Sequence, residues 1–160
     1  MLTPFTDNDI YAMRLAIDAS ARAAENGDGP FGATLVSPQG AVLLVAANMV
    51  KTADDCTAHA EMVLIRRAQT QLGRKVLRGA TVFTSGEPCA MCAGALFWAG
   101  VGRIVFAASQ ADVIEALGPD PAMPINSRTT LANAQPAVQI DGPLLREAAC
   151  VVLKQVAQNS

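Results

Sequence analysis

The one histidine of the chain lies in the stretch "TAHAEM", where Glu61 follows His59 by two residues. Further along, the stretch "EPCAMC" places Cys89 and Cys92 three residues apart. An imidazole and two thiolates are ligands that zinc prefers, and three protein ligands leave the fourth tetrahedral position for water. An open position of this kind is typical of catalytic zinc. The spacing therefore predicts a catalytic zinc centre held by His59, Cys89 and Cys92.

The predicted ligands can meet one ion if two helices begin beside it. Pro88 suits a helix start because proline has no N–H to leave unpaired, and thiolates are favoured at the positive end of the helix dipole. His59 and Glu61 would lie on nearly opposite sides of a helix interior. If Thr57 caps the helix, however, side chains of the first turn can flank the axis and reach the same ion. We therefore expect two helix N-termini to converge on zinc at the carboxyl edge of a sheet.

Glu61 is the expected proton carrier of this centre. Bound zinc lowers the pKa of water from about 15.7 toward about 7, and a neighbouring group must then take the proton and deliver it to the leaving atom. Glu61 lies beside His59 but is not needed as a ligand. General acid–base catalysis of this kind contributes a rate factor of about 100 to 10,000.

Hydrophobic periodicity and turn residues indicate the elements that position these side chains. A capping box of Thr6 and Asp9 favours a first helix, and the turn "PQG" favours a hairpin. The expected helices are 7–26, 58–72, 89–100, 110–118 and 142–158; the expected strands are 31–37, 41–48, 79–85, 102–109 and 137–141; and residues 118–136, with four prolines, form a long loop. Alternating helices and strands predict a largely parallel sheet covered by helices on both faces.

Composition restricts the class of protein. A chain of 160 residues that is 51% hydrophobic and 16% charged is expected to form a single domain over residues 1–160. With a net charge of −2 and no strong basic cluster, we expect no nucleic-acid partner. Short apolar runs and the lack of a secretion signal predict no membrane partner and a cytoplasmic location. Four cysteines in such a protein favour metal or redox chemistry over a disulfide framework.

Two other uses of the cysteines stay open at this point. "CTAH" makes Cys56 part of a Cys-x-x-His pair that could close a four-ligand structural zinc site with "CAMC". A thioredoxin-like redox pair of Cys89 and Cys92 is the second alternative, although it gives His59 and Glu61 no role. Cys150 is expected to be a core cysteine of the last helix.

The two motifs resemble the signature of the zinc-dependent cytidine and deoxycytidylate deaminase superfamily. The resemblance runs from about Gly29 to Ser109 and is strongest to bacterial guanine deaminases, whose pattern includes Pro-Phe-Gly-Ala and a tryptophan six residues after the second cysteine. It implies a three-layer α/β/α sandwich with a central mixed five-stranded sheet. It also implies a homodimer in which the "GALFW" helix packs against its twin.

The resemblance further implies the residues that bind the substrate. Phe31 and Trp98 offer aromatic faces to a planar base, and the Asn48 amide offers both a donor and an acceptor to its edge. The backbone N–H of Ala60 is placed to bind a ring carbonyl or the developing charge. These residues are the substrate-binding set that we expect.

A second carboxylate is expected in the loop after the fourth strand, where guanine deaminases carry an acidic residue that helps the amine to leave. Counting from Cys92 gives Asp120, and Glu115 is the second candidate. The family usually reads Gly-Phe-Asp at this place, whereas this chain reads Gly-Pro-Asp, and it lacks an aromatic C-terminal tail. Both differences bear on which base is accepted.

The reaction implied by the resemblance is zinc-dependent hydrolysis of guanine to xanthine and ammonia, with Glu61 as proton shuttle and Asp120 assisting. The expected partner is therefore a small nucleobase or nucleoside. Deamination of cytosine, a nucleoside or another aminated heterocycle is one alternative, and deamination of adenosine in transfer RNA is another. Outside enzymes, a binding module stapled by zinc through Cys56 is the remaining alternative.

Overall fold

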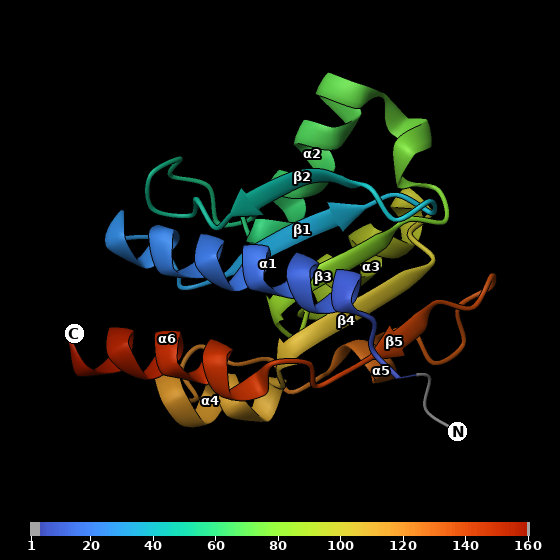
Figure 1. The fold of residues 1–160 in the computed structure, drawn as a ribbon. Coiled ribbons are helices and arrows are strands. Elements are labelled where there is room, and N and C mark those ends of the chain that lie inside the picture. Colours follow the sequence, from blue (N-terminus) through green and yellow to red (C-terminus); the bar gives the residue numbers. More distant parts are fainter. Residues whose placement is uncertain (1–3, 160) are drawn as a thin grey trace.

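The protein is built on one five-stranded sheet with helices on both faces (Figure 1). The structure is a computed structural model that describes residues 4–159. The strands are β1 (Gly32–Val36), β2 (Val42–Ala47), β3 (Thr81–Gly86), β4 (Arg103–Ala108) and β5 (Gln139–Asp141). The helices are α1 (Asp7–Glu25), α2 (Ala60–Leu72), α3 (Ala90–Ala99), α4 (Gln110–Leu117), α5 (Ser127–Thr130) and α6 (Arg146–Gln158), with a 3-10 turn at Arg74–Leu77. The predicted α/β/α class is confirmed.

Sheet order explains a difference from the expected topology. The order is β2-β1-β3-β4-β5, in which β3–β4 and β4–β5 are parallel while β1–β2 and β1–β3 are antiparallel. The expectation of a largely parallel sheet is therefore wrong, and the mixed sheet implied by the resemblance is confirmed. The reason is that the β1–β2 hairpin reverses the chain, and the crossover through α2 then brings β3 to the far side of β1 in the same direction as β2, and so antiparallel to β1.

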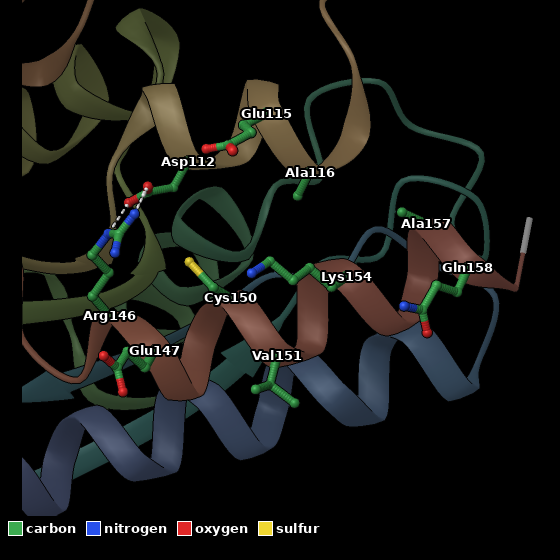
Figure 2. Close-up of a pocket in the computed structure, with 10 residues that line it drawn as sticks. All are labelled: Asp112, Glu115, Ala116, Arg146, Glu147, Cys150, Val151, Lys154, Ala157 and Gln158. Carbon is green, nitrogen blue, oxygen red and sulfur yellow. Dashed lines mark hydrogen bonds and ion pairs between the residues drawn. The ribbon is translucent and has the colours of Figure 1, made fainter.

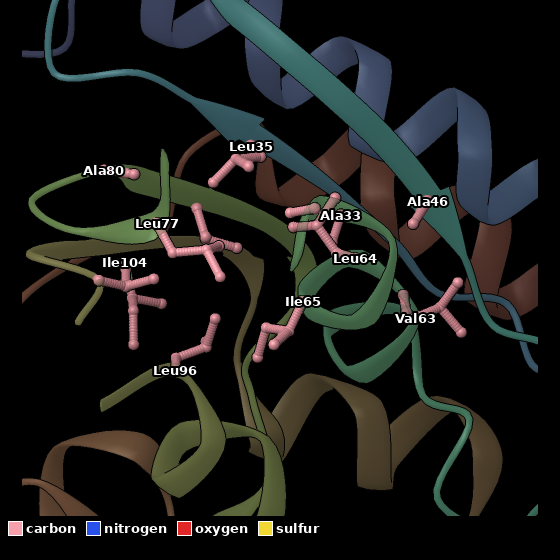
Figure 3. Close-up of a cluster of buried hydrophobic side chains, with 14 of the residues drawn as sticks. Ala33, Leu35, Ala46, Val63, Leu64, Ile65, Leu77, Ala80, Leu96 and Ile104 are labelled. Carbon is pink, nitrogen blue, oxygen red and sulfur yellow. The ribbon is translucent and has the colours of Figure 1, made fainter. Parts of the chain in front are cut away.

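Two hydrophobic layers enclose the sheet because its side chains alternate between faces. Val82 and Ile104 face α2 and α3, where they pack with Leu35, Leu64 and Leu96 (Figure 3). Their neighbours along the strands, Phe83 and Val105, face α1 and α6. The metal-binding motifs thus lie on helices that are held by their own buried layer.

Most predicted elements are confirmed, with differences toward the C-terminus. Thr6 and Asp9 form the expected capping box of α1. The expected loop over residues 118–136 contains α5. The last helix begins at Arg146 rather than at Gly142, because Leu144 is buried and its N–H donates to the Phe106 carbonyl before the helix starts.

In residues 4–159, no helix has the length and apolar character needed to cross a membrane.

An ion pair joins α4 to α6. The Asp112 carboxylate accepts hydrogen bonds from Arg146 Nη2 at 2.6 Å and Nε at 3.0 Å (Figure 2). Asp112 also accepts from the Ser109 N–H in the capping box of α4. The hydrogen bond from Arg146 lowers the pKa of Asp112 from 3.8 to about 2. The pair therefore stabilises the fold while the carboxyl is ionised.

We predict that Arg146→Met lowers the urea midpoint at pH 7 and that this difference shrinks as the pH falls from about 4 to about 2. The folded-state pKa lies below the unfolded value, so the stabilisation is complete above the ordinary pKa and is lost as pH falls through the folded-state pKa. Arg14→Met, at an exposed arginine of α1, is the control. An equal Arg146→Met effect at pH 7 and pH 2 would contradict the prediction.

Candidate metal centre and pocket

Two helix N-termini bring the predicted zinc ligands together. His59 is the N-cap of α2, Cys89 is the N-cap of α3, and Cys92 lies in the first turn of α3. The sulfurs of Cys89 and Cys92 lie 3.6 and 3.5 Å from His59 Nδ1, and the three ligand atoms all lie within 4.8 Å of one another. The predicted convergence of two helices is therefore seen in the structure.

The predicted cap of α2 is wrong in its position. Thr57 does not cap the helix, because its hydroxyl donates to Asp55 at 2.7 Å and accepts from Arg66 at 2.9 Å. His59 holds the N-cap position instead, with no hydrogen bond from its side chain to the helix. The imidazole is therefore free of a capping role and turns toward the two cysteines.

The two thiols interact with each other and with His59. A hydrogen bond from the Cys92 thiol, together with contact to His59, lowers the pKa of Cys89 to about 4. The same hydrogen bond and burial raise the pKa of Cys92. One thiolate is thus stabilised beside one thiol and one imidazole, and this soft nitrogen and sulfur donor set fits zinc. The site is formed by residues that are half-buried or buried.

Glu61 lies in the same turn of α2 but is not one of these three ligands. Its side chain is buried, with 6% of the residue exposed, and it lines the cavity above the cysteines. Burial raises the pKa of the Glu61 carboxyl. A carboxyl whose proton is held more tightly than usual suits transfer of a proton to and from a reacting molecule.

Cys56 and Cys150 lie outside the centre. Cys56 is exposed and is not a member of the ligand cluster found in the described residues. The structure therefore gives no support to the alternative of a four-ligand structural site that includes Cys56. Cys150 packs against the hydrophobic layer of α1 and α6 but is only half-buried, so it lies at the margin of the core rather than within it as expected.

A cavity of about 340 Å³ opens above the metal ligands. Its walls come from the start of β1, the end of β2, the first turns of α2 and α3, the apolar side of α4 and residues 118–123. His59, Glu61 and Cys89 form part of its lining. Its volume lies within the range of small-molecule sites, about 300–1,000 Å³.

Two predicted substrate residues line this cavity. The ring of Phe31 lies against Gly86, where an added Cβ would come within 3.0 Å of it. Asn48 Oδ1 accepts from the N–H groups of Gly29 at 3.3 Å and Val50 at 3.0 Å. Because both partners are donors, the oxygen is used within the protein. The amide therefore presents its Nδ2 donor to the cavity, rather than both donor and acceptor as expected.

Ala60 is the first residue of α2 and is fully buried between His59 and Glu61. N–H groups of the first turn have no acceptor within their own helix. The predicted role of the Ala60 N–H in binding the substrate stays a prediction.

Trp98 does not line the cavity, so its predicted place in the pocket of its own chain is wrong. It is 83% exposed and lies with Arg74, Lys75 and Arg78 around a separate hollow. Cys92 is in the first turn of α3 and Trp98 in the last. A helix of this length spans about 15 Å, which separates Trp98 from the metal ligands.

Of the two candidate carboxylates, Asp120 lines the cavity and Glu115 does not. Glu115 lies instead on the groove between α4 and α6, beside Cys150 and Lys154 (Figure 2). That groove is larger, at about 640 Å³, but the ligand cluster of the described residues does not lie in it. Helical spacing separates the two groups, since Val113, Ile114 and Leu117 face the cavity while Asp112, Glu115 and Ala116 face α6.

Sequence reasoning missed Gln110 and Met123, which also line the cavity. Glu87 lines the cavity as well, and its carboxylate accepts hydrogen bonds from Gln110 N at 2.9 Å and Ser127 Oγ at 2.8 Å. These bonds give Glu87 a structural role. The position of Gln110 directly after the capping Ser109 was the available signal, because a helix start at a strand end faces a site of this class.

Comparisons with known proteins agree with the geometry. The sequence model of the cytidine and deoxycytidylate deaminase zinc-binding region matches residues 6–108. The chain is 34% identical over 152 residues to a probable cytosine deaminase of Schizosaccharomyces pombe, covering 93% of this chain and 92% of that protein. It is 44% identical over 88 residues to a guanine deaminase of Bacillus subtilis, covering 55% of this chain and 56% of that protein.

Two further similarities widen the range of substrates among the relatives. A tRNA-specific adenosine deaminase of Bacillus subtilis is 41% identical over 103 residues, covering 64% of this chain and 63% of that protein. Among solved structures, a variant of NE0047 in complex with 8-azaguanine superposes with a TM-score of 0.80 at 27% identity, covering 93% of this chain and 85% of that one. The family match spans all three ligands and more than half of the chain, so the protein belongs to the zinc-binding cytidine and deoxycytidylate deaminase family.

Proposed function

We propose that the protein is a hydrolytic deaminase of a free nucleobase, with residues 1–160 acting as one domain and with His59, Cys89 and Cys92 as zinc ligands. The observation that carries this proposal is the meeting of these three ligands at a cavity that also buries Glu61. Guanine is the first candidate substrate, with xanthine and ammonia as products. The likeness to the Bacillus subtilis guanine deaminase and to NE0047 bound to 8-azaguanine supports it.

The chain's own residues supply the proton transfers of this reaction. Zinc bound by the three ligands would polarise a water molecule and so supply the nucleophile. Glu61 takes a proton from that water as the water oxygen attacks the ring carbon that bears the amine. Glu61 then delivers this proton to the adjacent ring nitrogen. Glu61 then carries the second proton to the amine, which leaves as ammonia while the carbonyl forms.

Residues around the cavity bind and orient the base. The Phe31 ring packs against the face of the base, and Asn48 Nδ2 donates to a ring carbonyl. The N–H of Ala60 is directed at the charge that develops on the ring. Asp120, which also lines the cavity, assists the departure of the amine.

Cytosine is the second candidate, because the fission-yeast relative named a probable cytosine deaminase is similar over nearly the whole of both chains. That alignment extends beyond residue 108, where the family match ends. A transfer-RNA substrate is less well supported, since the net charge of −2 offers little attraction to a polyanion. An open, carboxylate-bearing cavity also argues against a binding module that uses zinc only as a staple.

A homodimer through α3 is also part of the proposal. Met91, Ala95 and Trp98 lie on one stripe of α3, and Trp98 is the most exposed of the large apolar side chains in the described residues. Exposed apolar groups of this kind mark interaction surfaces.

A cytoplasmic location is also part of the proposal. All four cysteines are free of disulfides, which fits the reducing cytoplasm.

We predict that His59→Ala, Cys89→Ser and Cys92→Ser each reduce bound zinc from about one ion per chain to a small fraction, because a tetrahedral site with two protein ligands binds weakly. Metal analysis of the purified variants measures this. Cys56→Ala is the matched control and should keep its zinc. Loss of zinc from Cys56→Ala would instead support the structural zinc site.

Glu61→Gln is expected to keep zinc and to lose about 3 to 5 kcal/mol of transition-state stabilisation, which lowers kcat by a factor of about 150 to 5,000. The amide cannot carry the protons. Ammonia release at a saturating concentration of the nucleobase measures the loss. Near-normal turnover would remove Glu61 from the mechanism.

The substrate is identified by ammonia release from zinc-loaded protein with guanine, guanosine, cytosine, cytidine, adenine and adenosine, with Glu61→Gln as the blank. Turnover of guanine above the others supports the first candidate, and turnover of cytosine supports the second. Release from none of the six would contradict the proposed reaction.

The dimer predicts a molar mass of about twice 16.6 kDa by light scattering at micromolar concentration. Trp98→Glu should shift the protein to monomer, because a buried carboxylate at the interface is costly. Tyr11→Glu, at an aromatic residue of α1 that is also exposed, should leave the dimer intact. A monomeric wild-type protein would refute the interface.

A further inference from the structure

The segment 118–126, called the lid below, forms one wall of the cavity. It runs from the end of α4 to the start of α5. Five of its residues line the cavity, namely Gly118, Asp120, Pro121, Ala122 and Met123. The position of the lid therefore decides the shape of this part of the cavity.

The lid has little backbone hydrogen bonding of its own. Pro119, Pro121 and Pro124 have no N–H, and within the lid the Ile125 N–H donates to the Met123 carbonyl at 2.7 Å. A segment of this kind cannot hold its shape by a hairpin or a helix. Its position must be set by contacts with the rest of the protein.

Gln110 makes the hydrogen bonds that reach the middle of the lid. Its Nε2 donates to the Met123 carbonyl at 2.8 Å and to the Ile125 carbonyl at 3.4 Å. Among the described residues, no hydrogen bond or ion pair connects residues 119–125 to any other side chain outside the lid. The side chain of one glutamine thus joins the lid to the first turn of α4.

Gln110 is itself held in place by Glu87, which follows β3. One carboxylate oxygen of Glu87 accepts from the Gln110 N–H at 2.9 Å. The other accepts from the N–H of Ser127 at 3.2 Å and from its hydroxyl at 2.8 Å. Ser127 is fully buried and begins α5. Glu87 therefore holds both Gln110 and Ser127, the residue that directly follows the lid.

We propose that Gln110 is a positioning residue that latches the lid over the cavity and so sets the affinity for the base. The amide is the group that this role requires, because both of its partners are carbonyl oxygens and only a donor can bind them. In the absence of the latch the lid samples many positions. A bound base then has to order it again, so the cost is observed in KM rather than in the chemical step.

The test is Gln110→Glu, which keeps the size of the side chain and the backbone bond to Glu87 but replaces the donor with oxygens that repel the two carbonyls. We expect KM for the best base to rise about tenfold or more while kcat stays within about threefold. Zinc content and melting temperature should not change. Gln71→Glu, the same substitution at an exposed position of α2, is the matched control.

A second readout is independent of activity. Thermolysin cleaves before apolar residues that are not followed by proline, such as Ala122 and Ile125, and it acts on segments that open locally. We expect cleavage within 118–126 to be about fivefold faster in Gln110→Glu than in Gln71→Glu, with the cut sites identified by mass spectrometry.

The outcomes separate the latch from the proposed deamination, on which the effect on KM rests. Unchanged cleavage of the lid would overturn the latch. A fall in kcat at constant KM, or a lower melting temperature, would also overturn it, because Gln110 would then act in the chemistry or in the general stability of the fold. If none of the bases is turned over, the proposed function fails, and lid cleavage alone still decides the latch.

Discussion

The convergence of two helix N-termini is the constraint on which the rest of the structure depends. Three ligand atoms from the N-cap of α2 and the first turn of α3 lie within 4.8 Å of one another. This requires α2 and α3 to pack closely, and fully buried small residues such as Ala60 and Ala93 allow them to do so. The mixed sheet and its hydrophobic layer keep both helix starts at one end of the strands (Figures 1 and 3).

The cavity is built from parts of unequal rigidity. Its floor consists of side chains on the first turns of α2 and α3, whose backbones are hydrogen-bonded and packed against the sheet. Another wall is the proline-rich lid, whose Met123 carbonyl accepts from Gln110, a residue held in turn by Glu87. A rigid floor keeps the ligand atoms at fixed distances, whereas a lid held by few bonds can adjust to molecules of different shape. This division is in keeping with a family whose members act on several substrates.

Local signals predicted much of the fold and the centre of the site. The capping box at Thr6, the hairpin turn and the alternation of helices with strands are each written in a few neighbouring residues. The predicted ligands are likewise specified by short spacings. The prediction for Trp98 failed because this residue lies at the far end of α3 from Cys92, outside the cavity. The choice between the two candidate carboxylates was decided by the fold: Asp120 lines the cavity, whereas Glu115 faces α6.

The sequence by itself determined the chemistry, since one histidine, one carboxylate and two cysteines at these spacings suit an open zinc centre and few other sites. It also determined the class of fold through local periodicity. Only the tertiary structure decided that β1 also runs antiparallel to β3, that the Asn48 amide presents its donor, and that Gln110 reaches the lid. The physical reason is the range of the interactions: ligand types and helix starts are set by adjacent residues, whereas strand order, amide orientation and the latch depend on partners that meet only after the chain has folded.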